Sequence, residues 1–159
     1  MKLLGQFEVE VMKTTLDDRR NSTWRLFLTA HVRVVAQIEA KLAAAKLPPI
    51  EWYDVLFALK EMPDRRLRLS ELADRLLLSR SNLTRLVDRL EKEGLLYREA
   101  CPDDRRGMFA VLTAAGLTLQ QQMWEVYAAG IAEYFGDALD DAEVEVMQQA
   151  MRKVLAALS

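Results

Sequence analysis

The side chains best suited to chemistry in this sequence lie between Ser79 and Arg106. Hydroxyl, amide and guanidinium groups follow one another closely there. A guanidinium donates paired hydrogen bonds to a phosphate or to guanine O6 and N7, and short hydroxyl and amide side chains reach phosphates or base edges. The pattern therefore favours nucleic-acid binding over a chemical reaction. The candidate contact residues are Ser79, Arg80, Ser81, Asn82, Thr84, Arg85, Arg89, Asp104, Arg105 and Arg106.

The distribution of charge agrees with this interpretation, although the whole chain has a formal net charge of −2. Asp64 to Arg106 contains eleven Lys and Arg against nine Asp and Glu, and ten of the eleven are arginines. The rest of the chain has eleven basic and fifteen acidic residues. A basic middle between acidic ends can attract phosphate locally whatever the total charge.

Groups that catalysis or metal binding would need are scarce. His31 and Cys101 are the only histidine and the only cysteine, so neither an internal disulfide nor a cysteine-rich zinc site can form. Glycine-rich phosphate loops are also absent from the sequence. The acids from Asp140 to Glu145 suit the first turn of a helix better than a paired-carboxylate site. We therefore expect no enzyme activity, no cofactor and no metal, and we read Cys101 as incidental rather than as an oxidant sensor.

Apolar residues recur at helical spacing through most of the chain. Serine, threonine and aspartate at the heads of several periodic segments are suitable N-caps, and Gly94 suits a left-handed C-cap. The helices are expected from Ser22 to Leu47, from Ile50 to Met62, from Ser70 to Leu77, from Ser79 to Glu93, from Thr113 to Phe135 and, behind a capping box at Asp140, to Leu158.

A β-hairpin is expected after Gly94. Leu95–Ala100 and Met108–Leu112 have the composition of short strands, and the Pro, Asp and Gly residues of Cys101–Gly107 favour a turn between them. The order short helix, turn, helix, hairpin is that of a winged helix-turn-helix. In such a domain the second helix enters the major groove of DNA and the hairpin reaches beside it.

Spacing within the helix predicted from Ser79 separates a buried face from an outward one. Arg85 lies opposite the apolar stripe and is best suited to guanine, with Asn82 and Thr84 on the flanks. A merely solvated face is the alternative for one helix alone, and the attached hairpin counts against it. The stripe that must face the core is Leu83, Leu86, Val87 and Leu90.

Three segments resemble the MarR (multiple antibiotic resistance regulator) family. Ser79–Leu95 resembles the family's recognition helix, Asp104–Thr113 resembles its wing, and Trp52–Leu56 resembles its second helix. The resemblance covers about Ser22 to Leu158. It implies an obligate homodimer whose terminal helices interlock, with Arg106 entering the minor groove and Asp104 orienting it. Apolar stripes on the first and last two helices, too extensive for one small core, also indicate a dimer interface.

The resemblance further implies a cleft that binds a small aromatic or phenolic effector. Plain core packing is the alternative for each aromatic residue, and an interface role is the alternative for the histidine. The candidate ligand-binding residues are Trp24, Phe27, His31, Trp52, Tyr53 and Phe57.

The expected architecture is mainly α-helical with a small β-hairpin wing. Residues 50–112 are expected to form the DNA-binding winged helix-turn-helix, and residues 22–49 and 113–159 to form long dimerisation helices. Residues 1–21 are expected to be an N-terminal arm of unknown role. Either this arm crosses the partner subunit, or the true start of the protein is Met12. The expected function is that of a ligand-responsive repressor that binds double-stranded DNA at a pseudo-palindromic operator as a homodimer. The alternative is a winged-helix protein-interaction module without DNA readout.

Membrane insertion is not expected. No run approaches the ~18 uninterrupted apolar residues of a membrane helix, and the first residues break into acids before a signal-peptide core can form. The expected location is the cytoplasm.

Overall fold

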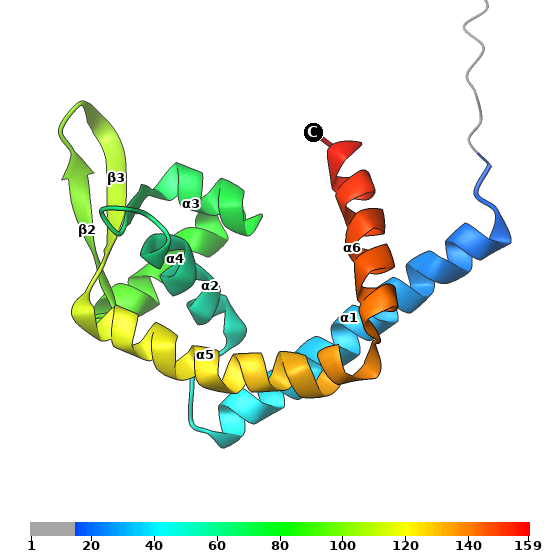
Figure 1. Ribbon diagram of the computed structural model, residues 1–159. Coiled ribbons are helices and arrows are strands. Elements are labelled where there is room, and N and C mark those ends of the chain that lie inside the picture. The colour runs from blue at the N-terminus through cyan, green and yellow to red at the C-terminus, as the bar shows by residue number, and fades with distance from the viewer. Residues whose placement is uncertain (1–14) are drawn as a thin grey trace, which may run out of the picture. The chain divides into compact units, whose positions relative to one another are not determined.

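The computed structural model describes residues 15–159, so most of the predicted arm of residues 1–21 lies outside the described residues. The part from Val34 to Ser159 forms one compact unit, and the described residues 15–33 belong to another. The mainly helical class with a small sheet is confirmed (Figure 1). In order, the elements are α1 (Asp18–Ala44), α2 (Ile50–Lys60), β1 (Arg66–Arg68), α3 (Leu69–Leu76), α4 (Arg80–Lys92), β2 (Leu96–Cys101), β3 (Asp104–Leu112), α5 (Ala114–Tyr134), the short 3-10 helix η1 (Gly136–Ala138) and α6 (Asp141–Ala156).

The sheet has three antiparallel strands in the order β1-β3-β2. The expected hairpin is present as β2 and β3, but β3 begins at Asp104 rather than at Met108, so the turn is shorter than predicted. Strand β1 was not predicted from the sequence. It has only three residues, with Leu67 alone buried opposite Ala110, which is too short for alternation to be visible.

Three of the six predicted helix starts are confirmed by side-chain caps. The Ser79 and Thr113 side chains accept hydrogen bonds from the backbone N–H groups of Asn82 and Gly116, at 3.2 and 3.0 Å. The Asp140 carboxylate accepts one from the Glu143 N–H at 2.8 Å, completing the predicted capping box. These bonds satisfy backbone groups that have no partner within the helix.

Two predicted helix starts are wrong. The Asp17 carboxylate accepts a bond from the Arg20 N–H at 2.8 Å, so α1 begins at Asp18 and Ser22 lies inside it. Helix α3 begins at Leu69, one residue before Ser70, because the Glu71 carboxylate reaches back to the Arg68 N–H at 3.3 Å. In both cases a nearby carboxylate supplies the cap in place of the serine.

Buried side chains from α2, α3, α4 and the sheet form one core cluster. Leu83, Leu86, Val87 and Leu90 of α4 are all buried in it, as their spacing predicts. A second cluster joins α1 after Val34 to α2 and α5 through Ile38, Leu42, Tyr53 and Met123. The first cluster fixes α4 against the wing, and the second fixes α2 against α5. None of the helices described for residues 15–159 is long and apolar enough to span a bilayer.

Candidate nucleic-acid interface

Helix α4 presents its polar side outward because its apolar stripe is fully committed to the core. Gly94, with φ of 71°, ends the helix in the left-handed conformation that glycine adopts most readily. The chain can therefore turn directly into β2. Every predicted contact residue of this region is exposed, namely Ser79, Arg80, Ser81, Asn82, Thr84, Arg85 and Arg89.

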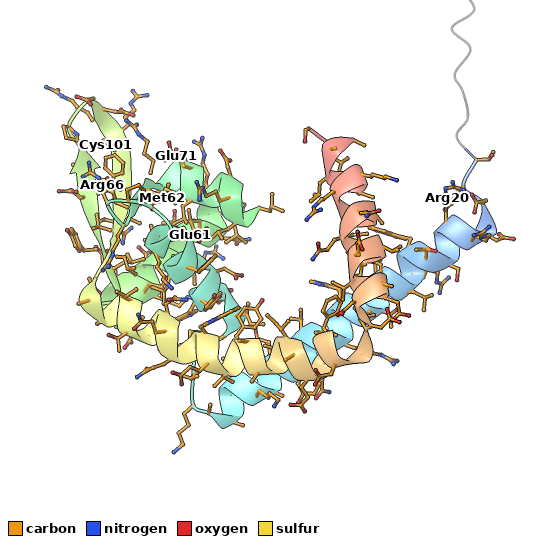
Figure 2. All side chains as sticks on the ribbon, in the orientation of Figure 1. Arg20, Glu61, Met62, Arg66, Glu71 and Cys101 are labelled. Carbon is orange, nitrogen blue, oxygen red and sulfur yellow. The ribbon has the colours of Figure 1, made fainter. Side chains whose placement is uncertain are left out.

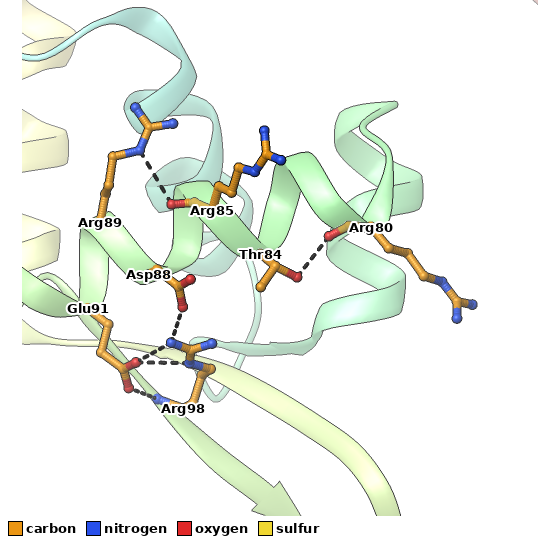
Figure 3. Close-up of polar contacts among 7 residues, drawn as sticks. All are labelled: Arg80, Thr84, Arg85, Asp88, Arg89, Glu91 and Arg98. Carbon is orange, nitrogen blue, oxygen red and sulfur yellow. Dashed lines mark hydrogen bonds and ion pairs between the residues drawn. The ribbon is translucent and has the colours of Figure 1, made fainter.

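Four of the five arginines predicted to contact nucleic acid have uncommitted guanidinium groups. Within residues 15–159, no hydrogen bond or ion pair engages the guanidinium of Arg80, Arg85, Arg105 or Arg106. In Figure 3 the side chains of Arg80 and Arg85 extend away from α4. Because these groups give up no intramolecular partner on binding, their full set of donors is available to phosphates or bases.

Arg89 differs from the other four. Its Nη1 lies 3.6 Å from a carboxylate oxygen of Glu51 at the start of α2, and its Nε donates to the Arg85 carbonyl oxygen at 3.3 Å (Figure 3). The guanidinium is thus engaged by the protein itself. A direct contact from Arg89 stays a prediction, and such a contact would have to compete with Glu51.

The hydroxyl groups of this region are partly committed as well. The Thr84 hydroxyl donates to the Arg80 carbonyl oxygen at 2.8 Å, and the hydroxyl oxygens of Ser79 and Ser81 lie 3.3 Å apart. A hydroxyl has a single proton to donate, so Thr84 in this rotamer can only accept another hydrogen bond. To donate to a phosphate, the Thr84 hydroxyl would have to give up its bond to the Arg80 carbonyl oxygen.

A groove of about 370 Å³ brings the helix and the wing together. Arg80 and Thr84 line it from α4, and Arg106 and Gly107 line it from β3. The start of α3 closes the groove through Ser70. The residues predicted from two separate sequence segments therefore share one surface.

The Asp104 side chain supports the turn of the wing by binding the backbone of Arg106. Its carboxylate accepts a hydrogen bond from the Arg106 backbone N–H at 3.0 Å and lies 3.6 Å from Nη1 of Arg68. Asp104 thus contacts the Arg106 backbone and pairs with the charge of Arg68, and the orienting role that the resemblance implies for it stays a prediction. Arg68 and Arg66 also lie over the ring of Phe109, at 5.6 and 4.6 Å from its centroid (Arg66 in Figure 2). Both arginines were missed, because they precede the helix-turn-helix in an unrecognised strand.

Arg98 fastens β2 to α4. Its Nε donates to Glu91 at 2.9 Å, its backbone N–H donates to the other Glu91 oxygen at 2.9 Å, and its guanidinium also pairs with Asp88 (Figure 3). The Arg98 backbone and side-chain donors hold the pKa of Glu91 below its ordinary value. Sequence reasoning placed Asp88 on the outward face but did not identify this link between helix and wing.

The six candidate ligand-binding residues lie on two helices, α1 and α2. Trp24 and Phe27 lie on α1 with their ring centroids 6.0 Å apart, and His31 is exposed further along the same helix. On α2, Tyr53 and Phe57 stack at 5.6 Å and line a cleft against α5. Trp52 packs instead against the core that holds α4, so it is not a lining residue of that cleft.

The chain is similar to known bacterial transcriptional regulators. The MarR family profile matches residues 46–107, which contain α2, the helix-turn-helix and the tip of the wing. The chain is 36% identical to the HTH-type transcriptional regulator MhqR of Bacillus subtilis over 86 residues, which are 54% of this chain and 59% of MhqR. It therefore spans less than two thirds of that relative's length.

Two solved structures from Streptomyces coelicolor match over a larger share. AbsC, a MarR family transcriptional regulator, is 30% identical with a TM-score of 0.81, over 91% of this chain and 97% of AbsC. Sco3205, a MarR family transcriptional regulator solved in complex with DNA, is 31% identical with a TM-score of 0.82, over 91% of each chain. The similarity thus extends over the terminal helices as well as the winged helix-turn-helix.

Proposed function

Because the chain belongs to the MarR family, we propose that it is a sequence-specific DNA-binding transcription regulator. The observation that carries the proposal is the set of uncommitted guanidinium groups on one winged helix-turn-helix surface. Arg80 and Arg106 line the same groove from helix and wing, and Arg85 extends from the outward face of α4. We propose that Arg85 reads a base in the major groove and that Arg106 enters the adjacent minor groove. Such a role would place the protein in the cytoplasm.

The regulator is proposed to act as a homodimer through its terminal helices. Helix α6 has no buried residue within the protomer, and Val146, Val154 and Leu155 are each more than half exposed. An apolar groove of about 330 Å³ runs between α6 and the segment that follows α5, with Met147 and Met151 among its lining residues. An exposed apolar surface of this kind is normally covered by a partner. Two-fold symmetry would then place two α4 helices at half-sites ~10 bp apart on a pseudo-palindrome.

Repression in response to a small effector is the finer part of the proposal. A dimer seated across an operator would exclude other proteins from that DNA. The α2–α5 cleft adjoins the helix whose first turn is linked to α4 through Glu51 and Arg89. A ligand in that cleft could therefore bias the position of α4 by binding one arrangement more tightly than another.

The experiment that tests the proposal is selection of bound fragments from the host genome with the purified full-length chain. We expect enrichment of fragments that share one pseudo-palindromic motif, which would also identify the neighbouring regulated gene. The Arg85→Ala variant serves as the control for base readout. If no motif is enriched although the protein is folded, the winged helix is a protein-interaction module and the proposal fails.

A further inference from the structure

The cleft between α2 and α5 has a chemical character of its own. It has a volume of about 500 Å³, and all of its lining residues belong to the unit that begins at Val34. Asp54 and Lys60 line it from α2, and Gln120 and Trp124 line it from α5. The question is which charge of ligand these walls accept.

Half of the lining residues are aromatic. The Tyr53 ring lies 5.6 Å from Phe57 and 5.9 Å from Trp124 in stacked arrangements, and 5.0 Å from Tyr127 edge to face. Tyr53 is buried, whereas Phe57 and Trp124 are 37% and 45% exposed, so ligands can reach the rings from solvent. The faces of such rings carry partial negative charge and attract cations.

Asp54 adds a carboxylate that lacks a counter-ion. It is half-buried, and no residue of the described chain, 15–159, forms a hydrogen bond or ion pair with its side chain. Burial raises the pKa of Asp54, and the nearby carboxylates of Glu39 and Glu51 raise it further. A cation in the cleft would stabilise the ionised form of this carboxyl group.

Gln120 contributes a second acceptor. Its side chain is 1% exposed, and its amide oxygen is buried without a hydrogen-bond partner among the described residues. Buried acceptors are almost always paired, so an unpaired one favours a ligand that brings a donor. The amide oxygen thus favours a ligand with a hydrogen-bond donor, while the rings and the carboxylate favour one with a positive charge.

Within the described part of the chain, Lys60 is the one positively charged residue that lines the cleft. It is exposed and stands in the last turn of α2, where a positive charge is favoured by the partial negative charge of the helix end. Its position is explained without an anionic ligand. Lys60 nonetheless supplies the direct comparison, because an aromatic acid would pair with it rather than with Asp54.

We propose that the α2–α5 cleft binds an organic cation, a protonated amine whose ammonium group pairs with Asp54 and whose apolar body lies against the rings of Tyr53 and Trp124. This ligand class differs from the phenolic effector that the sequence resemblance implies. The biological meaning of the site rests on the proposed regulator function, but binding itself can be measured without DNA.

The experiment is calorimetric titration of the full-length protein at neutral pH with three probes of one shape: 2-phenylethylamine, which is cationic, 2-phenylethanol, which is neutral, and phenylacetate, which is anionic. We expect the amine to bind at least about tenfold more tightly than the alcohol, and phenylacetate to bind most weakly. The wild-type series decides the sign of the preference even if a variant fails to fold.

Variants then assign the preference to its residue. Asp54→Asn keeps the shape of the side chain and should reduce amine affinity about tenfold while leaving the alcohol unchanged. Glu125→Gln removes an exposed acid next to Trp124 that does not line the cleft, and it should change neither. Lys60→Gln should leave amine affinity equal or slightly higher. Thermal melting shows whether each variant is folded.

Two results would overturn the inference. Tighter binding of phenylacetate, weakened by Lys60→Gln, would make the cleft a site for aromatic acids. If all three probes bind equally or not at all to protein that still binds DNA, the cation site is excluded and the regulator proposal stands. If the amine binds to protein that does not bind DNA, the cation site stands and the regulator proposal fails.

Discussion

Arg98 holds Glu91 with two hydrogen bonds of 2.9 Å, one from its backbone N–H and one from its guanidinium Nε (Figure 3). The first residue belongs to β2 and the second to the last turn of α4. Because both oxygens of the carboxylate are used, the angle between the helix and the wing is fixed at this point. Simultaneous binding of α4 and the wing to one duplex would depend on that angle.

The first prediction concerns the pH dependence of stability. Arg98 lowers the pKa of Glu91 from its ordinary value of 4.5, so the ionised carboxylate stabilises the folded state at neutral pH. That contribution is fully present above the unfolded-state pKa and is lost as the pH falls through the lower folded-state value. Glu91→Gln should therefore be less stable than wild type by about 0.5–1 kcal/mol at pH 7, with the difference disappearing in acid. Urea unfolding at several pH values measures it, and a difference that is the same at pH 7 and in acid would contradict the assignment.

The second prediction concerns base readout by Arg85. Arg85→Ala should weaken binding to the selected operator more than binding to random duplex, because a bidentate base contact discriminates by ~1–3 kcal/mol. Fluorescence anisotropy with both duplexes measures the two affinities. Arg89→Ala is the matched control on the same helix, since its guanidinium is already engaged by Glu51. Equal weakening on both duplexes would show that Arg85 contacts phosphate.

The third prediction concerns the wing. Arg106→Ala should weaken binding to operator and random duplex alike and reduce the slope of log K against log salt by roughly one per subunit. The reason is that a narrow minor groove attracts an arginine by charge without detailed base reading. Asp104→Asn, which alters the support of the Arg106 backbone while removing no positive charge, should weaken binding without lowering the slope. An unchanged affinity and slope for Arg106→Ala would exclude the hairpin from the interface.

The fourth prediction concerns the dimer. Met151→Glu places a charge in the apolar groove beside α6 and should abolish dimerisation and DNA binding together, because the charge would be buried without a partner. A charge in place of Val35 on α1 should act in the same way. Gln149→Glu adds the same charge at an exposed position of α6 and should remain dimeric. Sedimentation velocity distinguishes the two states, and a dimeric Met151→Glu protein would place the interface elsewhere.

Local signals predicted the fold well where the responsible residues are close in sequence. Ser79, Thr113 and Asp140 cap helices as expected, and Gly94 ends α4. Strand β1 could not be predicted in this way, because its pairing partner in β3 lies more than forty residues away, at Leu67 with Ala110. The starts predicted at Ser22 and Ser70 were wrong because a neighbouring carboxylate takes the capping role there.

In the candidate site too, features set by nearby residues were predicted, whereas contacts between distant segments were not. The exposed face of α4 follows from helical spacing alone, but spacing does not reveal which arginines the protein itself engages. Arg89 looked as available as Arg85 until Glu51 of α2 was placed beside it. Tyr53 and Phe57 were predicted to line a cleft, whereas Gln120 and Trp124 were missed because periodicity does not say which helix each face meets. Contacts between distant segments are thus the part that required the structure.

The central claim is that α4 and the wing bind duplex DNA together, and the salt dependence of wild-type binding tests it most directly. If Arg80, Arg105 and Arg106 each neutralise a phosphate in both subunits of a dimer, the slope of log K against log salt should be about −5. Anisotropy titrations of the selected operator across a range of salt concentrations give this slope. A steep linear decline near that value, with random duplex bound far more weakly than the operator, is the predicted result. A slope near zero, or equal affinity for both duplexes, would contradict the account.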